Sequence, residues 1–233
     1  MRAMILAAGR GERMRPLTDT LPKPLLRVGG EPLIVWHIRR LVAAGIRDIV
    51  INHAWLGDRI EAALGAGADF DAHLRYSPET QALETAGGIA HALPQLGDAP
   101  FLVVNGDVWC DWNPAAARAQ ASRLEAAGGQ AWLLLVDNPT HHPEGDFHLL
   151  EDGTLGATAG PRLTYAGIGV YHPSLFAGLP PGTPARLAPL LVDAIGRGTV
   201  HGARHGGTWV DVGTPQRLAE LDAMLTHKAN GTQ

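Results

Sequence analysis

The chain is predicted to form an α/β domain, a mixed and mostly parallel β-sheet with helices on both faces. Three observations predict this fold class. Short apolar runs alternate with segments of helical length, which is the order of a doubly wound sheet. The run at residues 101–104 is continuously apolar, as a strand buried on both faces requires. The 233 residues are 45% hydrophobic and 18% charged, which suits one well-packed domain.

Strands and helices are predicted to alternate over the first 136 residues. A strand at residues 4–6 comes first. Pro32 suits the first turn of a helix over 32–44, and Gly45 suits its end. Pro94 is expected to end another helix, because proline cannot donate a helical hydrogen bond. The remaining elements of this half are strands at 48–52, 73–76, 101–104 and 132–136, and helices at 56–64, 86–93 and 114–127.

The pattern changes after residue 140. Segments 147–150 and 154–155 flank Asp152-Gly153, a pair typical of a hairpin turn. A strand at 164–171 and helices at 187–195 and 216–225 follow. Thr214 and Pro215 suit the cap and first position of the last helix. Because no linker or repeat interrupts the chain, we expect a single domain over residues 1–226 and a flexible tail over 227–233.

Composition excludes several classes of protein. The net charge of −4 argues against a nucleic-acid or membrane-surface partner. No apolar run approaches the ~20 residues of a membrane span, and no secretory leader is recognised. The single cysteine, Cys110, fits a reducing cytosol and is interpreted as a core or site-wall residue. The spacing of the histidines matches no closed metal site. We expect a cytoplasmic protein, and its oligomeric state stays open.

The most informative stretch follows the first strand. Residues 6–26 read LAAGRGERMRPLTDTLPKPLL. Gly9 and Gly11 allow backbone N–H groups to approach phosphate oxygens closely, and four cations in the same stretch can neutralise a polyphosphate. A dinucleotide-binding loop would need a third glycine where Met14 stands, and the Gly-Lys-Ser/Thr of a P-loop is absent. The four cations are Arg10, Arg13, Arg15 and Lys23.

Two aspartates follow or interrupt apolar strands and are candidate metal ligands. Asp107 comes just after the strand at 101–104, and ligands of open α/β sheets bind beyond the carboxyl ends of strands. Asp211 lies in the apolar run 209–212, where an acid is costly unless it is paired or holds a metal. Mg²⁺ takes carboxylate and phosphate oxygens. The alternative is that each aspartate only caps the following turn or helix, although Thr214 already serves as the helix cap after Asp211.

The string at 6–26 resembles the signature of the sugar-nucleotidyltransferase family, Leu-Ala-Ala-Gly-x-Gly-x-x-Met-x-Pro-Leu-Thr followed by Pro-Lys-Pro-Leu. The resemblance covers nearly the whole chain. It implies a Rossmann-like, GT-A-like fold and Mg²⁺-dependent transfer of a nucleotidyl group to a sugar 1-phosphate. Residues 51–57, 83–85, 105–109 and 136–139 further resemble uridylyltransferases of cell-wall recycling, which implies UTP and N-acetylmuramic acid α-1-phosphate as substrates.

The resemblance also implies roles for individual residues. The implied catalytic residues are Arg15, Lys23 and Asp107, and the implied metal ligands are Asp107 and Asp211. The implied nucleotide contacts are Ala8, Gly9, Gly11, Glu12, Arg13, Lys23, Gln81 and Gly87. The implied sugar contacts are Asn105, Asp146 and Gly167. Many relatives carry a Glu-Lys-Pro triad that this chain lacks, so no second phosphate-binding lysine is carried over. Arg162, Arg204 or the pair His141-His142 are the candidate partners of a carboxylate on the acceptor.

Three other functions remain open from the sequence. A guanylyl- or thymidylyltransferase for another sugar phosphate would differ in base specificity. A non-catalytic relative that only binds sugar nucleotides is disfavoured, because Lys23, Asp107 and Asp211 are all present. A nicotinamide oxidoreductase is disfavoured by the missing third glycine.

Overall fold

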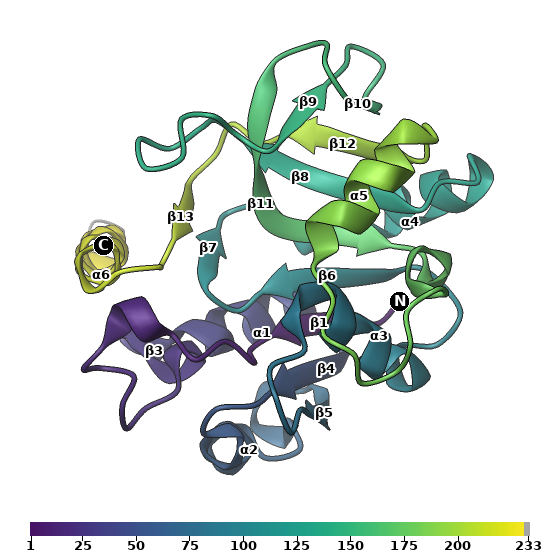
Figure 1. Ribbon diagram of the computed structural model, residues 1–233. Coiled ribbons are helices and arrows are strands. Elements are labelled where there is room, and N and C mark those ends of the chain that lie inside the picture. Colours follow the sequence, from purple (N-terminus) through teal and green to yellow (C-terminus); the bar gives the residue numbers. More distant parts are fainter. Residues whose placement is uncertain (231–233) are drawn as a thin grey trace.

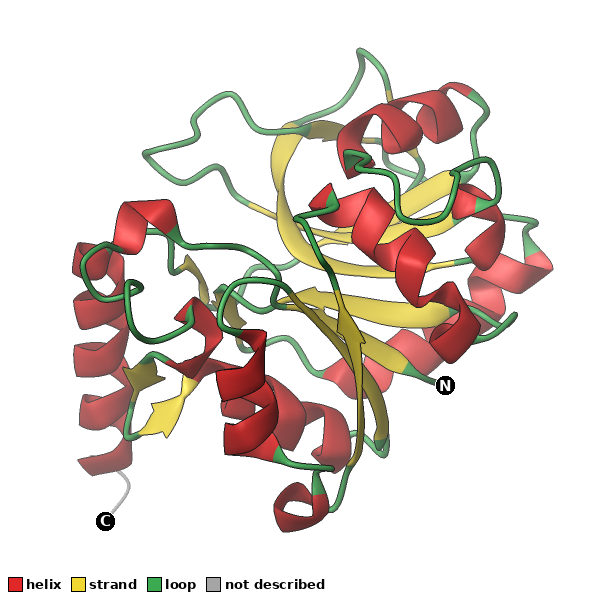
Figure 2. Cartoon of the chain, turned by 60° about the horizontal axis from the view of Figure 1, so that its bottom comes forward, coloured by secondary structure: helices red, strands yellow, loops and turns green. Residues whose placement is uncertain are grey.

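The computed structural model describes residues 1–230, and residues 231–233 lie outside the described part. Its centre is a nine-stranded sheet with helices packed on both faces (Figures 1 and 2). The strands are β1 (Ala3–Leu6), β4 (Asp48–His53), β5 (His73–Pro78), β6 (Phe101–Asn105), β8 (Ala131–Val136), β9 (Phe147–Leu149), β10 (Leu155–Gly156), β11 (Arg162–Tyr171) and β12 (Val200–Arg204). The α-helices are α1 (Leu33–Ala43), α2 (Gly57–Leu64), α3 (Glu84–Leu96), α4 (Ala117–Ala126), α5 (Leu187–Gly196) and α6 (Pro215–Asn230).

The order of the strands explains the change of pattern near residue 140. Strands β6, β1, β4 and β5 lie side by side and run parallel. Strand β11 returns antiparallel to β6, and it also pairs antiparallel with β8 and β9. Strand β12 joins the far side of β8 in parallel. Both halves of the chain therefore contribute to one mixed sheet, as predicted.

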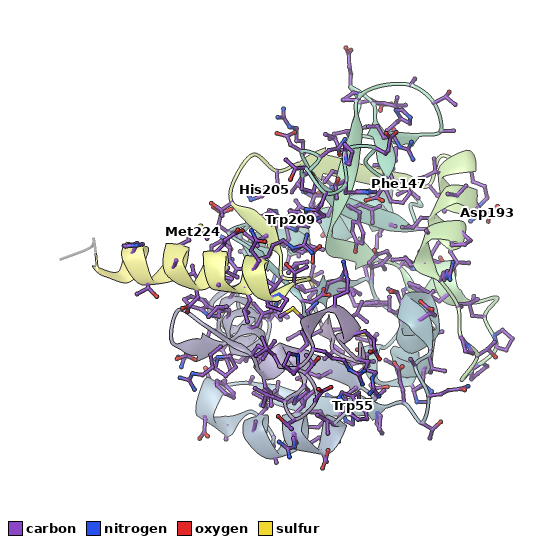
Figure 3. The ribbon with its side chains drawn as sticks, turned by 60° about the vertical axis from the view of Figure 1, so that its left-hand side comes forward. Trp55, Phe147, Asp193, His205, Trp209 and Met224 are labelled. Atoms are coloured by element: carbon purple, nitrogen blue, oxygen red, sulfur yellow. The ribbon has the colours of Figure 1, made fainter. Side chains whose placement is uncertain are left out.

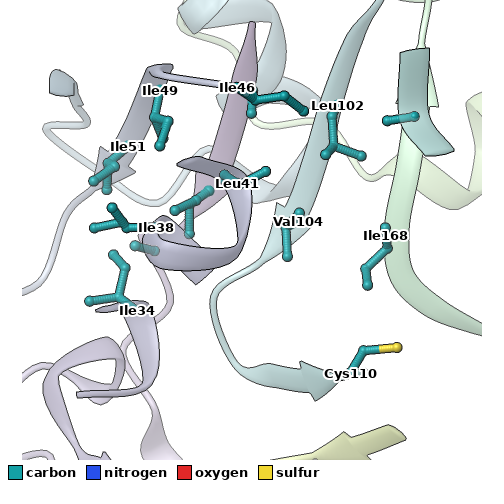
Figure 4. Packing of buried hydrophobic residues seen from close by; sticks show 14 of the residues in the cluster. Ile34, Ile38, Leu41, Ile46, Ile49, Ile51, Leu102, Val104, Cys110 and Ile168 are labelled. Atoms are coloured by element: carbon teal, nitrogen blue, oxygen red, sulfur yellow. The ribbon is translucent and has the colours of Figure 1, made fainter. Parts of the chain in front are cut away.

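The sheet divides the core into two layers. Ala3 and Ile5 pack into one cluster with α1 and α4, whereas Met4 packs into the other with α3 and α5. This alternation is the consequence of the two-residue period of a strand. Figure 4 shows the first layer, where Ile38 and Leu41 of α1 face the sheet.

Two predicted boundaries differ from the structure. Helix α3 continues through Pro94 to Leu96, so the expectation that Pro94 ends it was wrong. A proline in the last turn removes only one helical donor, and Gly97 still closes the helix by donating to the carbonyl of Leu93. Helix α6 runs to Asn230, past the helix end expected at residue 225. The rest of the expected tail, 231–233, falls outside the described residues.

Two small ribbons lie outside the main sheet. Strands β2 (Arg27–Val28) and β3 (Glu31–Pro32) form one, and β7 (Val108–Cys110) and β13 (Trp209–Asp211) form the other. The sequence predicted β13 but not its partner β7.

Helix α6 packs on both ribbons and so joins the C-terminal part of the chain to its N-terminal half (Figure 1). Asp222 of α6 accepts a hydrogen bond from Gly29 N–H at 2.7 Å. Gly29 has φ +55, and a Cβ there would lie 2.8 Å from Leu225, so only glycine allows this close docking. Among the described residues, none of the helices has both the length and the apolar character needed to cross a membrane.

Candidate active site

A cavity of about 310 Å³ opens at the carboxyl ends of the parallel strands. Leu6, Asn52 and Asn105 stand at or near the ends of β1, β4 and β6 and line it. This is the edge at which open α/β sheets bind ligands. The other lining residues are Ala7, Ala8, Gly9, Lys23, Pro24, Glu79, Ala82, Glu84, Thr85, Gly106 and Asp107. Five residues expected from the sequence are therefore brought together here: Ala8, Gly9, Lys23, Asn105 and Asp107.

The Lys23 ammonium and the Asp107 carboxylate form an ion pair in this cavity, with Nζ 2.7 Å from Oδ2. The lysine side chain is only 8% exposed, whereas the aspartate side chain is 42% exposed. Pro22 and Pro24 flank Lys23 and would favour an extended backbone around it, but Lys23 is not extended. It begins a short 3₁₀ turn, Lys23–Leu25, and its stem packs beside Gly11. The pair therefore combines a fixed, buried cation with a carboxylate that reaches open space.

The loop after β1 carries the remaining expected cations and is folded on itself. Gly11 has φ +69, a conformation that glycine adopts without strain. Arg10 pairs with Glu12 at 2.5 Å. Arg15 pairs with Asp19 at 3.0 Å and with Glu12 at 3.4 Å. These pairs are exposed, and their members are not among the residues that line the cavity.

The β7–β13 ribbon brings the two candidate metal ligands close in the backbone. Asp211 pairs with Val108 across the ribbon, and the N–H of Val212 donates to the carbonyl of Asp107 at 2.9 Å. Residues that are 104 positions apart in the sequence are therefore neighbours in the fold. The pairing of β7 with β13, which the sequence did not predict, is what positions them.

Nitrogen atoms of basic side chains surround the Asp211 carboxylate. Its Oδ2 lies 3.3 Å from Arg217 and 3.5 Å from Nε2 of His141. The guanidinium of Arg13 also lies nearby, because a Cβ at Gly213 would be 3.3 Å from Arg13 and 3.0 Å from Asp211 Oδ1. The loop of His141 thus closes over the same carboxylate that Arg13 approaches from the N-terminal half.

The donor set at Asp107 and Asp211 fits a hard dication. Both side chains offer carboxylate oxygens, the donors that Mg²⁺ prefers, and a bound triphosphate would supply further oxygens. Lys23 and Arg217 now balance the two negative charges.

Sequence reasoning missed a buried polar network on the opposite wall of the cavity. Asn52 Oδ1 accepts the N–H of Ala7 at 3.0 Å, and Asn52 Nδ2 donates to Glu79 Oε1 at 2.7 Å. The N–H of Leu83 donates to Glu79 Oε2 at 2.9 Å. Glu79 is 8% exposed and makes no ion pair within the described part of the chain. Asn52 and Glu79 stand at the carboxyl ends of β4 and β5, so the argument that selected Asp107 would have selected them too.

The expected base contacts lie at different depths. Gln81 is exposed and outside the cavity lining. Gly87 is buried, and a Cβ there would lie 2.4 Å from the backbone oxygen of Thr183, so its small size serves the packing of α3 against residues 183–185. At Gly88 a Cβ would instead lie 2.6 Å from Glu79 Oε1. Gly88 therefore faces the buried network.

The expected sugar contacts are linked through β11. Gly167, with φ +74, lies against Asn105, since a Cβ there would be 2.7 Å from Asn105 Nδ2. It stands where the register of β11 and β8 shifts between Tyr165 and Gly169, as a β-bulge does. Asp146 accepts the N–H of Tyr165 at 2.8 Å. The bulge thus brings the backbone of Gly167 to the rim of the cavity at Asn105.

The amino-acid sequence of the chain is similar to those of known nucleotidyl transferases. The family described as nucleotidyl transferase matches residues 2–145. Over 228 residues the chain is 54% identical to the N-acetylmuramate alpha-1-phosphate uridylyltransferase of Neisseria meningitidis, covering 96% of this chain and 98% of that protein. It is 37% identical to the enzyme of the same name from Caulobacter vibrioides, with 96% of each chain covered.

A solved structure from Bacillus anthracis, assigned as a glucose-1-phosphate thymidylyltransferase, has the same fold. Its TM-score is 0.84 at 23% identity, with 97% of this chain and 95% of that chain covered. The predicted fold class and the predicted family are both confirmed. The chain therefore belongs to the nucleotidyl transferase family, among the sugar-1-phosphate nucleotidyltransferases.

Proposed function

We propose that the chain transfers UMP from UTP to N-acetylmuramic acid α-1-phosphate, giving a UDP-sugar and pyrophosphate. The observation that carries this proposal is the Lys23–Asp107 pair at the carboxyl edge of the sheet, in a chain aligned over its length with two relatives named for this activity. The free thiol of Cys110 supports the further proposal that the enzyme works in the reducing cytosol.

The reaction needs no protein nucleophile. A phosphate oxygen of the sugar attacks the α-phosphorus of UTP, and the bond to the pyrophosphate oxygen breaks. Lys23 would bind phosphate oxygens from its buried position, and the backbone of Ala8, Gly9 and Gly11 would approach the same phosphates. A Mg²⁺ ion held by Asp107 and Asp211 would neutralise charge on the triphosphate. Catalysis then rests on positioning and charge neutralisation.

Arg13 and Arg15 of the loop after β1 differ in how far each must rearrange to contact the phosphates. The Arg13 guanidinium and the Asp211 carboxylate both lie near Gly213, which supports the proposal that Arg13 contacts the departing pyrophosphate. Arg15 would first have to leave Asp19 and Glu12. Because exposed ion pairs are worth only about 0–1 kcal/mol, this rearrangement costs little.

The Glu79 network supports a base that carries a ring N–H, such as uracil, and disfavours cytosine. A triphosphate carries negative charge and would avoid the wall with Glu79 and Glu84, which leaves this end for the nucleoside. The Glu79 carboxylate has about four acceptor positions, of which Asn52 and Leu83 occupy two. A remaining lone pair can accept the N3–H of uracil, whereas cytosine presents an acceptor at that position. Gln81 and Gly87 stay proposals as further base contacts.

The acceptor carries a lactyl carboxylate, which requires a donor near Asn105, Asp146 and Gly167. Arg204 is held by both oxygens of Asp137, at 2.7 and 2.6 Å, an exposed pair that it would have to leave in order to serve. His142 lies 3.0 Å from Asp146 and is the better placed of the residues that the sequence suggested. A charge-assisted hydrogen bond of roughly 1.5–3 kcal/mol corresponds to a preference of about tenfold to a hundredfold.

Release of pyrophosphate, measured across four nucleoside triphosphates and a panel of sugar 1-phosphates, tests the proposal. We expect UTP and N-acetylmuramic acid 1-phosphate to give the highest kcat/KM. Asp107→Asn or Asp211→Asn should lower turnover about 100-fold or more. Equal use of N-acetylglucosamine 1-phosphate would refute the acceptor alone. Near-normal turnover of both aspartate variants would refute the metal assignment.

A further inference from the structure

A second cluster of metal-ligating side chains lies outside the active-site cavity. Cys110, Asp111 and His205 bring a thiol, a carboxylate and an imidazole within 4.8 Å of one another. Cys110 ends β7 (Figure 4), and His205 directly follows β12, near Trp209 of β13 (Figure 3). Because Asp111 and His205 are 94 residues apart, no local spacing in the sequence indicates the cluster.

Backbone hydrogen bonds hold these side chains in place. Thr208 N–H donates to Asp111 Oδ2, and Asp111 N–H donates to the carbonyl of Thr208, each at 3.0 Å. The N–H of His205 donates to the carbonyl of Leu135 at 2.7 Å. Since the supporting bonds use one carboxylate oxygen of Asp111, the other oxygen, Oδ1, is left directed at His205 Nε2, 2.6 Å away.

Gly207 leaves room directly against these two atoms. A Cβ at this position would lie 2.3 Å from Asp111 Oδ1 and 2.6 Å from His205 Nε2. Any other residue would therefore cover both ligand atoms. Gly207 thus leaves open the space in front of a carboxylate oxygen and an imidazole nitrogen, and the Cys110 thiol lies within 4.8 Å of both atoms.

We propose that Cys110, Asp111 and His205 bind one Zn²⁺ ion. A thiolate, an imidazole and a carboxylate form the mixed donor set that Zn²⁺ accepts, with three protein ligands and a fourth position for water. The same set is unsuited to Mg²⁺, which prefers oxygen alone. The site is thus chemically distinct from the pair Asp107 and Asp211.

Two features of the cluster oppose binding of the ion: the proton of the thiol and the positive charge of Arg40. Metal binding must release the proton of the Cys110 thiol, so the affinity for the ion should rise with pH. The Arg40 guanidinium stacks on Trp109 at 4.6 Å and interacts with Cys110 and Asp111. The thiolate and the carboxylate together still supply two negative charges, which match a dication.

Zn²⁺ at this site would tie β7 to the segment that connects β12 and β13. Asp107 and Asp211 flank the other end of the same ribbon. The ion would therefore stabilise the ribbon on which the proposed active site depends, without contacting the substrates.

Co²⁺ bound to the full-length, metal-free chain provides a sharp test, because thiolate-to-Co²⁺ charge transfer gives a near-ultraviolet band. Cys110 is the single cysteine of the chain, so any such band reports this residue. We expect one Co²⁺ per chain with this band and its loss when Zn²⁺ is added. Zn²⁺ at about 100 times its Kd should raise the melting temperature by roughly 5–10 °C.

Two variants separate this site from other metal-binding groups. Cys110→Ser should abolish the band. Both Cys110→Ser and His205→Gln should need at least ten times more Zn²⁺ than the parent for the same rise in melting temperature. His73→Gln, which changes an exposed histidine, should leave both unchanged. Absence of the band in the parent, or an equal Zn²⁺ shift in the parent and both variants, would overturn the proposal. Neither measurement uses catalysis, so the outcome is independent of the proposed function.

Discussion

Replacing Lys23 with methionine tests whether the Lys23–Asp107 pair serves function or stability. Methionine keeps the apolar stem of the side chain, which packs beside Gly11, and removes the charged terminal ammonium group. Truncation to alanine would open space in addition, because the lysine is 8% exposed. The variant Lys23→Met therefore isolates the ammonium group.

The structure indicates how large each effect should be. Removing one partner of a fully buried pair costs about 3–5 kcal/mol. The Asp107 side chain is 42% exposed, so its carboxylate can be rehydrated, and we expect a loss of about 1 kcal/mol or less. This corresponds to a melting temperature lower by about 2–4 °C. Transfer should fall about 10²- to 10³-fold, because a charge that stabilises the transition state is lost.

Thermal melts and pyrophosphate release on the same preparations separate the two effects. Arg39→Met, which breaks an exposed pair with Glu31, is the matched control and should leave both measurements near the parent values. The reasoning about Lys23 is refuted if Lys23→Met melts more than about 10 °C lower while its remaining folded fraction transfers UMP at the parent rate.

Further predictions follow from individual contacts. Gly88→Ala places a methyl group against Glu79 and should raise the KM for UTP. In Gly87→Ala the added methyl group clashes with the backbone of Thr183, so this variant should lower the free energy of unfolding by about 1–3 kcal/mol. If Gly87→Ala instead raises the KM for UTP and leaves the melting temperature unchanged, Gly87 is a base contact. Arg15→Ala breaks only exposed pairs, so its melt should be unchanged while pyrophosphate release falls, and unchanged release would remove Arg15 from the mechanism. Burial lowers the pKa of His37 from 6.5 to about 4. The unfolded chain therefore binds a proton between these values that the folded chain does not, and the unfolding free energy should decrease by about 3 kcal/mol as the pH falls from 6.5 to 4. Denaturant titrations of the parent and His37→Phe check this, and an equal pH dependence in both would contradict it.

The parallel half of the sheet was predictable because its signals are local. Strands β1, β4 and β6 contain short apolar runs, and the runs at 4–6 and 101–104 become the adjacent strands β1 and β6. The position of Asp107 at the edge of the sheet follows from the same local pattern. The loop after β1 was found because its glycines and cations are contiguous in the sequence.

The rest depends on contacts between distant segments. Strand β12 was missed because its five residues include a glycine, a histidine and an arginine, so no apolar run marks it. Strand β7 has only three residues and is stabilised by its partner β13. The network of Asn52 and Glu79 stands at the carboxyl ends of β4 and β5, where ligands of open α/β sheets also bind, but no glycine loop or family motif marks these two residues. The burial of Lys23 depends on the fold of the loop around Gly11, which its prolines alone do not specify.

The distribution of charge along the cavity constrains how a nucleotide can enter it. Lys23 supplies a fixed cation at one end, and the buried carboxylate of Glu79 supplies a fixed negative charge at the other. A triphosphate is attracted to the first and repelled by the second, and both interactions are strengthened by burial. We infer that a nucleotide binds with its base toward Glu79 and its phosphates toward Lys23 and Asp107.

Asn105, which lines the same cavity and contacts Gly167 of β11, then lies on the side from which an acceptor phosphate can approach. The antiparallel return of β11 beside β6 brings its bulge to the edge where the parallel strands end, so the second half of the chain reaches the cavity at Asn105.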